Sequence, residues 1–200
     1  MMNGSNFQAH TNHHIMANIF IIHGYGGYSR ENWFSSLKEE LEKLGHQVII
    51  PDFPNPGAPL LKSWLVFFEK YSPEIDENSI IIGHSLGGAF LLSLLEKRRL
   101  KAAFFVATVS GPINHEVDDF IKTFTHKLFN WKKITGNCNQ FYVLHSDKDP
   151  YIPLQQAESL AINLNTKVIM IKNGGHLNSK AGFKTFPLLL EKVVRVASIR

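Results

Sequence analysis

The sequence contains a single cysteine and no long hydrophobic run, and each absence excludes a class of protein. Cys138 has no second cysteine with which to form an internal disulfide, which favours a reducing compartment. The apolar run Ile19–Ile22 ends at His23, far short of the ~20 apolar residues that a membrane helix needs. The first residues also lack the basic start and apolar segment of a secretory signal. We therefore expect a soluble, cytoplasmic protein with no membrane partner.

Charged residues are scarce as well, at 19% of the chain against 44% hydrophobic residues. This composition is typical of a globular domain and excludes a disordered chain. The net charge of +4 gathers partly in Lys97–Lys101 and His126–Lys133, and neither stretch carries a nucleic-acid-binding motif. The first stretch ends a predicted helix, where cations interact favourably with the helix dipole. We expect no nucleic-acid partner.

Apolar strands and amphipathic helices alternate along most of the chain. We predict strands at 19–22, 48–50, 79–82, 102–108, 141–144 and 167–171, and helices at 31–44, 60–71, 85–99, 115–131, 154–164 and 181–196. Because short β-branched runs are typical of strands buried on both faces, this order predicts an α/β fold. Its sheet is mostly parallel and six-stranded, with helices on both faces. Residues 1–17 are predicted to form a disordered extension, and residues 18–200 a single domain.

The sequence Gly83–Gly87, which reads GHSLG, matches the G-x-S-x-G pattern of a nucleophile elbow. It directly follows a predicted strand and opens an apolar helix. That setting holds the serine in a strained turn, lifts its hydroxyl clear of the sheet and points a helix N-terminus at a developing oxyanion. A serine in this position can also simply cap a helix. The strand, the helix and the extra Gly88 favour Ser85 as a nucleophile.

A serine nucleophile needs a base within hydrogen-bond reach, and His176 is the candidate. It lies in Asn173–Leu177, directly after the last predicted strand, and a flexible glycine pair precedes it. His84 is adjacent to the nucleophile, so we expect it to point elsewhere and to have a structural or pocket-lining role.

The base in turn needs a carboxylate to orient it, and two aspartates follow the predicted strand 141–144. Asp149 begins the pattern D-x-x-I-P, whose prolines fix the loop and start the next helix. Asp147 is the competing candidate, with a turn or capping role as its alternative. The loop position favours Asp149 without excluding Asp147.

The loop after the first strand, His23–Gly27, is rich in glycine and can supply an oxyanion hole. Leu86 follows the nucleophile, so its backbone N–H is one expected donor. Tyr25 is the expected second donor, with Gly26 as the alternative. Ser29 stands where a dinucleotide-binding G-x-G-x-x-G pattern needs its third glycine. A P-loop, an H-E-x-x-H motif and a cysteine pair are also missing, so we expect neither a cofactor nor a metal.

Taken together, these motifs resemble an α/β-hydrolase. More particularly, the sequence is similar to the small serine hydrolase family typified by the retinoblastoma-binding serine hydrolase and its bacterial relatives. The segments that carry this resemblance are 23–27, 32–34, 51–54, Trp64, 83–88, 149–153 and 174–183.

The resemblance implies a catalytic triad of Ser85, His176 and Asp149, and so selects Asp149 over Asp147. It also implies a carboxylesterase-like enzyme that cleaves a small acyl ester through an acyl-enzyme. Because some members of the family are known mainly through protein partners, the alternative is a protein-binding module with little catalysis.

The segment between the fourth and fifth predicted strands, 109–140, bears on access to the site. It is too short for a separate lid domain once it has formed the predicted helix 115–131. We therefore expect an open groove bounded by Tyr25, the proline-rich loop 51–59 and the residues after Ser110. Such a groove favours short acyl chains.

Overall fold

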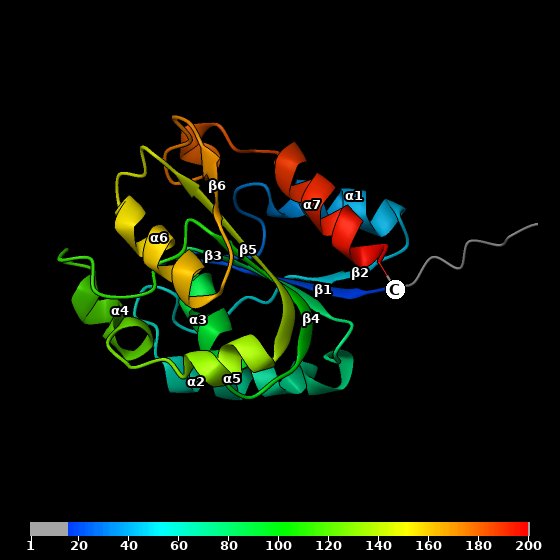
Figure 1. The fold of residues 1–200 in the computed structure, drawn as a ribbon, viewed down its shortest axis with the longest axis horizontal. Helices are drawn as coiled ribbons and strands as arrows, with labels where there is room; N and C mark the ends of the chain where they lie inside the picture. The colour runs from blue at the N-terminus through cyan, green and yellow to red at the C-terminus, as the bar shows by residue number, and fades with distance from the viewer. Residues whose placement is uncertain (1–15, 200) are drawn as a thin grey trace, which may run out of the picture.

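The computed structural model describes residues 16–199, and it confirms the predicted α/β fold (Figure 1). A six-stranded sheet has the order β2-β1-β3-β4-β5-β6, and every neighbouring pair is parallel. The strands are β1 (Asn18–Ile22), β2 (Gln47–Ile49), β3 (Ile80–His84), β4 (Leu100–Val106), β5 (Cys138–Ser146) and β6 (Val168–Ile171).

The central strands are buried on both faces, as their apolar sequences predict. Every residue of β3 and β4 is buried, and so are four of the five residues of β1. The register places Ile22 of β1 beside Gly83 of β3, and His84 beside Val106 of β4. The carboxyl ends of these three strands therefore meet at one edge of the sheet, where an α/β protein binds its ligands.

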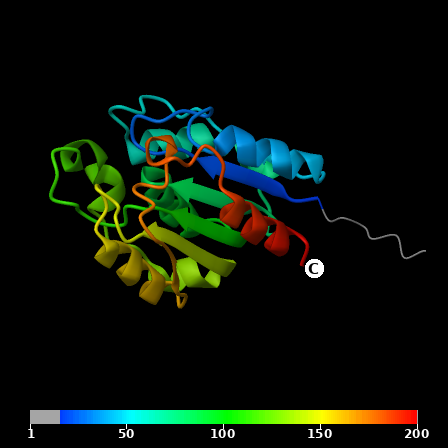
Figure 2. The ribbon, with the colours of Figure 1, turned by 90° about the horizontal axis from the view of Figure 1, so that it is seen from above.

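Helices cover both faces of the sheet (Figures 1 and 2). On one face, α1 (Phe34–Lys43) and α7 (Pro187–Ala197) pack over Ile19 and Ile21. The second face holds the larger apolar core, built over Phe20 and Ile22. Its helices are α2 (Leu61–Phe68), α3 (Leu86–Leu95), α4 (Asp118–Thr125), α5 (Trp131–Gly136) and α6 (Leu154–Asn163). Two short 3-10 helices, Glu69–Glu74 and Ser179–Ala181, complete the fold.

The single helix predicted at 115–131 is wrong, because α4 ends at Thr125 and a second helix, α5, begins only at Trp131. The break is held by Glu96 at the end of α3, which accepts a hydrogen bond from the backbone N–H of Asn130 at 2.8 Å and pairs with Lys127 at 2.8 Å. The side chain of Asn130 then caps α5 by accepting from the N–H of Lys133.

The last predicted helix, 181–196, also begins later than expected. Proline lacks an N–H and is favoured in the first helical turn, and Pro187 is the first residue of α7. The residues before it form the 3-10 helix Ser179–Ala181 and a left-handed turn at Gly182, whose φ is 91°. This irregular segment reaches the functional edge of the sheet.

The predicted disordered extension lies largely outside the described residues. Ala17, which that prediction placed in the extension, is buried, and its N–H donates to His46 Nδ1 at 3.3 Å. Its carbonyl accepts from Gln47, so the chain joins the sheet here. Among residues 16–199, no helix is long and apolar enough to cross a membrane.

Candidate active site

Ser85 forms the turn between β3 and α3 with a positive φ of 55° and a ψ of −118°. A residue with a side chain rarely adopts this conformation, and such strain gathers at functional sites. The N–H of Ser85 donates to Val106 at 2.9 Å, which fixes the turn to β4. Close packing allows no side chain at Gly87. The Cβ of any other residue at this position would lie 2.8 Å from the carbonyl oxygen of His23 and closer still to that of Ile22. The turn is therefore clamped between the ends of β1 and β4.

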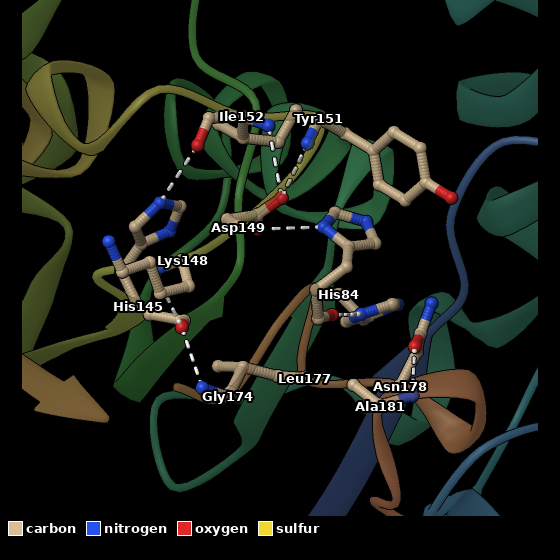
Figure 3. A network of polar contacts seen from close by, with 12 residues as sticks. His84, His145, Lys148, Asp149, Tyr151, Ile152, Gly174, Leu177, Asn178 and Ala181 are labelled. Carbon is tan, nitrogen blue, oxygen red and sulfur yellow. Dashed lines mark hydrogen bonds and ion pairs between the residues drawn. The ribbon is translucent and has the colours of Figure 1, made fainter. Parts of the chain in front are cut away.

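His176 and Asp149 lie in contact, on the loops after β6 and β5. Nδ1 of His176 lies 2.8 Å from Oδ2 of Asp149, so Nδ1–H donates to the carboxylate. The other carboxylate oxygen accepts from the N–H groups of Tyr151 and Ile152, at 2.9 and 3.1 Å (Figure 3). Because Nδ1 carries the proton, a neutral His176 keeps Nε2 as a proton acceptor.

The pKa of the Asp149 carboxyl is held below its usual value. Burial alone would raise that pKa, but the hydrogen bond from His176 and its electrostatic attraction, with the two backbone N–H groups, outweigh burial. The side chain is only 1% exposed, and that of His176 is 10% exposed. Asp149 is therefore an ionised, rigidly held partner for the imidazole.

Asp147 has a different partner from Asp149. Its Oδ1 accepts from the N–H of Asn173 at 2.7 Å, and the neighbouring Ser146 Oγ accepts from Gly174 at 2.8 Å. These two bonds join the loop that carries Asp149 to the loop that carries His176. Asp147 fixes the relative position of the two loops and does not touch the imidazole.

His84 lies behind His176, with the two rings 5.0 Å apart. Its Nε2–H donates to the backbone carbonyl of His176 at 3.1 Å, and its Nδ1 is buried with no hydrogen-bond partner in the described chain. Complete burial, with a smaller contribution from His176, lowers the pKa of His84 to about 3. His84 is thus a neutral donor that supports the backbone of His176, in line with its expected structural role.

Ser85 and His176 line the same cavity, although no hydrogen bond joins Ser85 Oγ to the imidazole. Catalytic hydrogen bonds are often long before substrate binds, so this separation is compatible with a nucleophile and its base.

Two backbone N–H groups beside Ser85 have no acceptor among residues 16–199: those of Leu86 and Tyr25. Leu86 is the first residue of α3, where N–H groups have no partner within the helix. By contrast, the N–H of Gly26, the alternative donor, is occupied by the carbonyl of Pro56 at 2.8 Å. The geometry therefore favours Tyr25 over Gly26.

The cavity over Ser85 has a volume of about 770 Å³, within the range of small-molecule sites. Apolar side chains from the segment after β4 form part of its wall: Val109, Ile113, Val117 and Ile121. Tyr25 and Tyr151 also line it. The expectation that loop 51–59 bounds the site is wrong. None of its residues lines the cavity, and Asp52 instead accepts from the N–H of Ser29.

Sequence reasoning missed two features of this cavity. Gln156 of α6 holds the apolar wall through four hydrogen bonds with the backbone of residues 110–112, at 2.8–3.2 Å. Glu31 lines the cavity, and burial raises the pKa of its carboxyl to about 7, against a smaller lowering effect of the Tyr28 backbone. Neither side chain belongs to a motif. The described part of the chain contains no cluster of three metal-ligating side chains.

The domain as a whole is similar to known hydrolases. The family model described as serine hydrolase matches residues 19–195. The putative hydrolase YdeN of Bacillus subtilis is 30% identical over 179 residues, which are 86% of this chain and 92% of that protein. The serine hydrolase RBBP9 of Rattus norvegicus is 26% identical over 162 residues, which are 80% of this chain and 86% of that protein.

The fold agrees with these sequence matches. The crystal structure of the ydeN gene product from B. subtilis has a TM-score of 0.86 at 27% identity, covering 92% of this chain and all of that one. Est1E from Butyrivibrio proteoclasticus shares the fold at 16% identity, with a TM-score of 0.67 over 94% of this chain and 88% of that one. The chain therefore belongs to the serine hydrolase family, with an α/β-hydrolase fold, and is a hydrolase.

Proposed function

We propose that the protein cleaves a carboxylic ester with a small acyl group, using Ser85 as nucleophile, His176 as general base and Asp149 as the carboxylate that orients the base. One observation carries this proposal: a strained serine at a helix N-terminus shares a cavity with a histidine whose Nδ1–H donates to a buried carboxylate at 2.8 Å. This combination gives each group the environment that its step requires.

In the first half of the reaction, Ser85 Oγ bonds to the ester carbonyl carbon while its proton passes to Nε2 of His176. The carbonyl oxygen becomes an oxyanion and accepts from the N–H groups of Leu86 and Tyr25. The intermediate then collapses, its bond to the alcohol oxygen breaks, and the alcohol leaves with the proton from Nε2. An acyl-enzyme on Ser85 remains.

In the second half, water attacks the acyl carbon and gives a proton to Nε2. The bond to Ser85 Oγ breaks, Oγ regains the proton, and the carboxylic acid departs. The charge on Asp149 stabilises the imidazolium that forms in each half and does not accept its proton. The apolar wall of Val109, Ile113, Val117 and Ile121 offers a surface for the acyl group.

A binding module that has kept the fold is the competing function. Binding alone gives no reason to hold Ser85 in a strained conformation or to bury Asp149 against His176. The two functions differ in one measurable property, the reactivity of Ser85.

The test is covalent labelling of the full chain with a neutral fluorophosphonate, followed by intact-mass measurement. The wild-type protein should gain one adduct, and Ser85→Ala should gain none and should lose at least about 10³-fold in esterase kcat. Ser179→Ala is the matched control, because this serine also lines the cavity but should leave labelling unchanged. An unlabelled wild type, or a labelled Ser85→Ala, would refute the assignment.

A further inference from the structure

One part of the cavity wall carries three cations, Arg30, Lys180 and Lys184. They come from two separate segments, the loop between β1 and α1 and the irregular segment before α7. Across residues 16–199, no carboxylate forms a salt bridge with any of them, and none of their side chains has a hydrogen-bond partner. We call these three residues the cationic wall.

The two segments of the cationic wall are fixed to each other. Asn32 Oδ1 accepts from the N–H of Ser179 at 3.0 Å, and Trp33 Nε1–H donates to the carbonyl of Leu177 at 2.9 Å. Trp33 is completely buried, so it anchors both segments to the core. The backbone segments that carry the three cations are therefore held to each other beside His176 and do not move as independent loops.

Little negative charge opposes these cations within the cavity. Glu31 is the one carboxylate in its described lining, and its raised pKa of about 7 leaves it only partly ionised near neutral pH. Asp149 is ionised, but it does not line the cavity, and its oxygens already accept hydrogen bonds from His176, Tyr151 and Ile152. Three cations against at most these two carboxylates leave the local charge positive, and the cations are available for a ligand.

We propose that the substrate of this hydrolase carries an anionic group, a carboxylate or a phosphate, that binds Arg30, Lys180 and Lys184 while its ester lies over Ser85. This inference rests on the proposed function and adds the substrate class. Guanidinium and ammonium groups both donate charge-assisted hydrogen bonds to such oxygens. The three side chains are exposed, so their effect is screened by salt, and each contributes modestly.

The test compares kcat/KM for pairs of esters that differ only in charge. One pair places the group on the alcohol: 3-carboxyphenyl acetate and its neutral 3-carbamoylphenyl analogue. The second pair places it on the acyl side: mono-p-nitrophenyl succinate and its neutral succinamate. A 3-phosphonophenyl acetate distinguishes phosphate-like from carboxylate recognition. We expect the charged member of at least one pair to react about 10-fold faster at low salt, because each exposed contact contributes modestly and three act together.

The variant Arg30→Gln/Lys180→Gln/Lys184→Gln should reduce this preference to about 2-fold or less, mainly by raising KM for the charged esters. The matched control, Lys97→Gln/Arg99→Gln/Lys132→Gln, removes the same charge from exposed residues that do not line the cavity, and should keep the preference. Raising the salt from about 0.02 M to about 0.5 M should weaken the preference in the wild type.

Equal rates within every pair, or a preference that survives in the cationic-wall variant, would overturn the inference. Such a result is distinguishable from a failure of the proposed function, because labelling of Ser85 by the neutral fluorophosphonate does not depend on these cations. A labelled enzyme without charge preference refutes the substrate class alone.

Discussion

At the scale of single residues, the two aspartates after β5 show how hydrogen-bond partners separate a catalytic role from a structural one. Asp149 accepts from His176, whereas Asp147 accepts from the N–H of Asn173 in the adjoining loop. The residue types and the loop are the same, and only the direction of each side chain differs. Their substitution by asparagine should therefore have unequal effects.

Asp149→Asn should lower kcat/KM by about 10³- to 10⁴-fold, because an amide cannot stabilise the imidazolium and favours the wrong tautomer of His176. Asp147→Asn should cost less than about 10-fold, because the amide oxygen still accepts from Asn173. The measurement is ester hydrolysis by both variants, with denaturation curves to verify folding. Equal losses would contradict the assignment of Asp149.

At the scale of secondary-structure elements, α3 is the helix on which the site depends. All ten of its residues are buried, and it packs against the ends of β1 and β4 without room for a side chain at Gly87. The atoms that crowd this position are backbone carbonyl oxygens, which cannot rotate away. The helix therefore holds Ser85 and Leu86 in place through close backbone packing.

Gly87→Ala should destabilise the protein by about 3 kcal/mol or more, since the new methyl group forces α3 away from β1. Gly136→Ala in α5 is the matched control: its added Cβ meets nothing within 4 Å, and alanine should stabilise this exposed helical position by about 0.5 kcal/mol. Urea denaturation of both variants tests this. A Gly87→Ala protein as stable as the wild type would show that α3 can shift.

The elements also show what could be predicted from the sequence. Strands such as Ile80–His84 are predictable because a continuous apolar run, here residues 80–82, indicates a strand that is buried on both faces. The break between α4 and α5 is not predictable in this way, because it depends on a hydrogen bond to Glu96, which is distant in the sequence.

The same limit applies to the site. The G-x-S-x-G pattern identifies Ser85 locally, whereas the choice of Tyr25 over Gly26 depends on a contact of Gly26 with Pro56.

At the scale of the whole molecule, buried histidines make stability depend on pH. His23, His84 and His145 are almost completely buried, and burial is the main cause that lowers the pKa of each. The folded protein keeps them neutral, whereas the unfolded chain takes up protons below its pKa of about 6.5. Their contribution is therefore full above pH 6.5 and is lost as the pH falls toward the lowered folded values.

The free energy of unfolding should consequently fall below pH 6.5, by up to about 1.4 kcal/mol per pH unit for each of these histidines. His145→Gln should reduce that slope, because it removes one of the three groups while glutamine can still donate to the carbonyl of Ile152. His115→Gln, at an exposed residue, is the control. Urea unfolding between pH 5 and pH 7.5 gives the slopes, and identical slopes for wild type and His145→Gln would refute this origin.

The attachment of the apolar wall through Gln156 has an evolutionary consequence. One side chain of α6 holds the backbone of residues 110–112, and the segment beyond it contributes Ile113, Val117 and Ile121 to the cavity. Ser85, His176 and Asp149 lie on other loops. After gene duplication, this segment can therefore accumulate substitutions and change its shape under selection for new metabolites, while the residues proposed to cleave the bond remain as they are. In this fold, substrate specificity can therefore change while the residues that are proposed to perform the reaction stay the same.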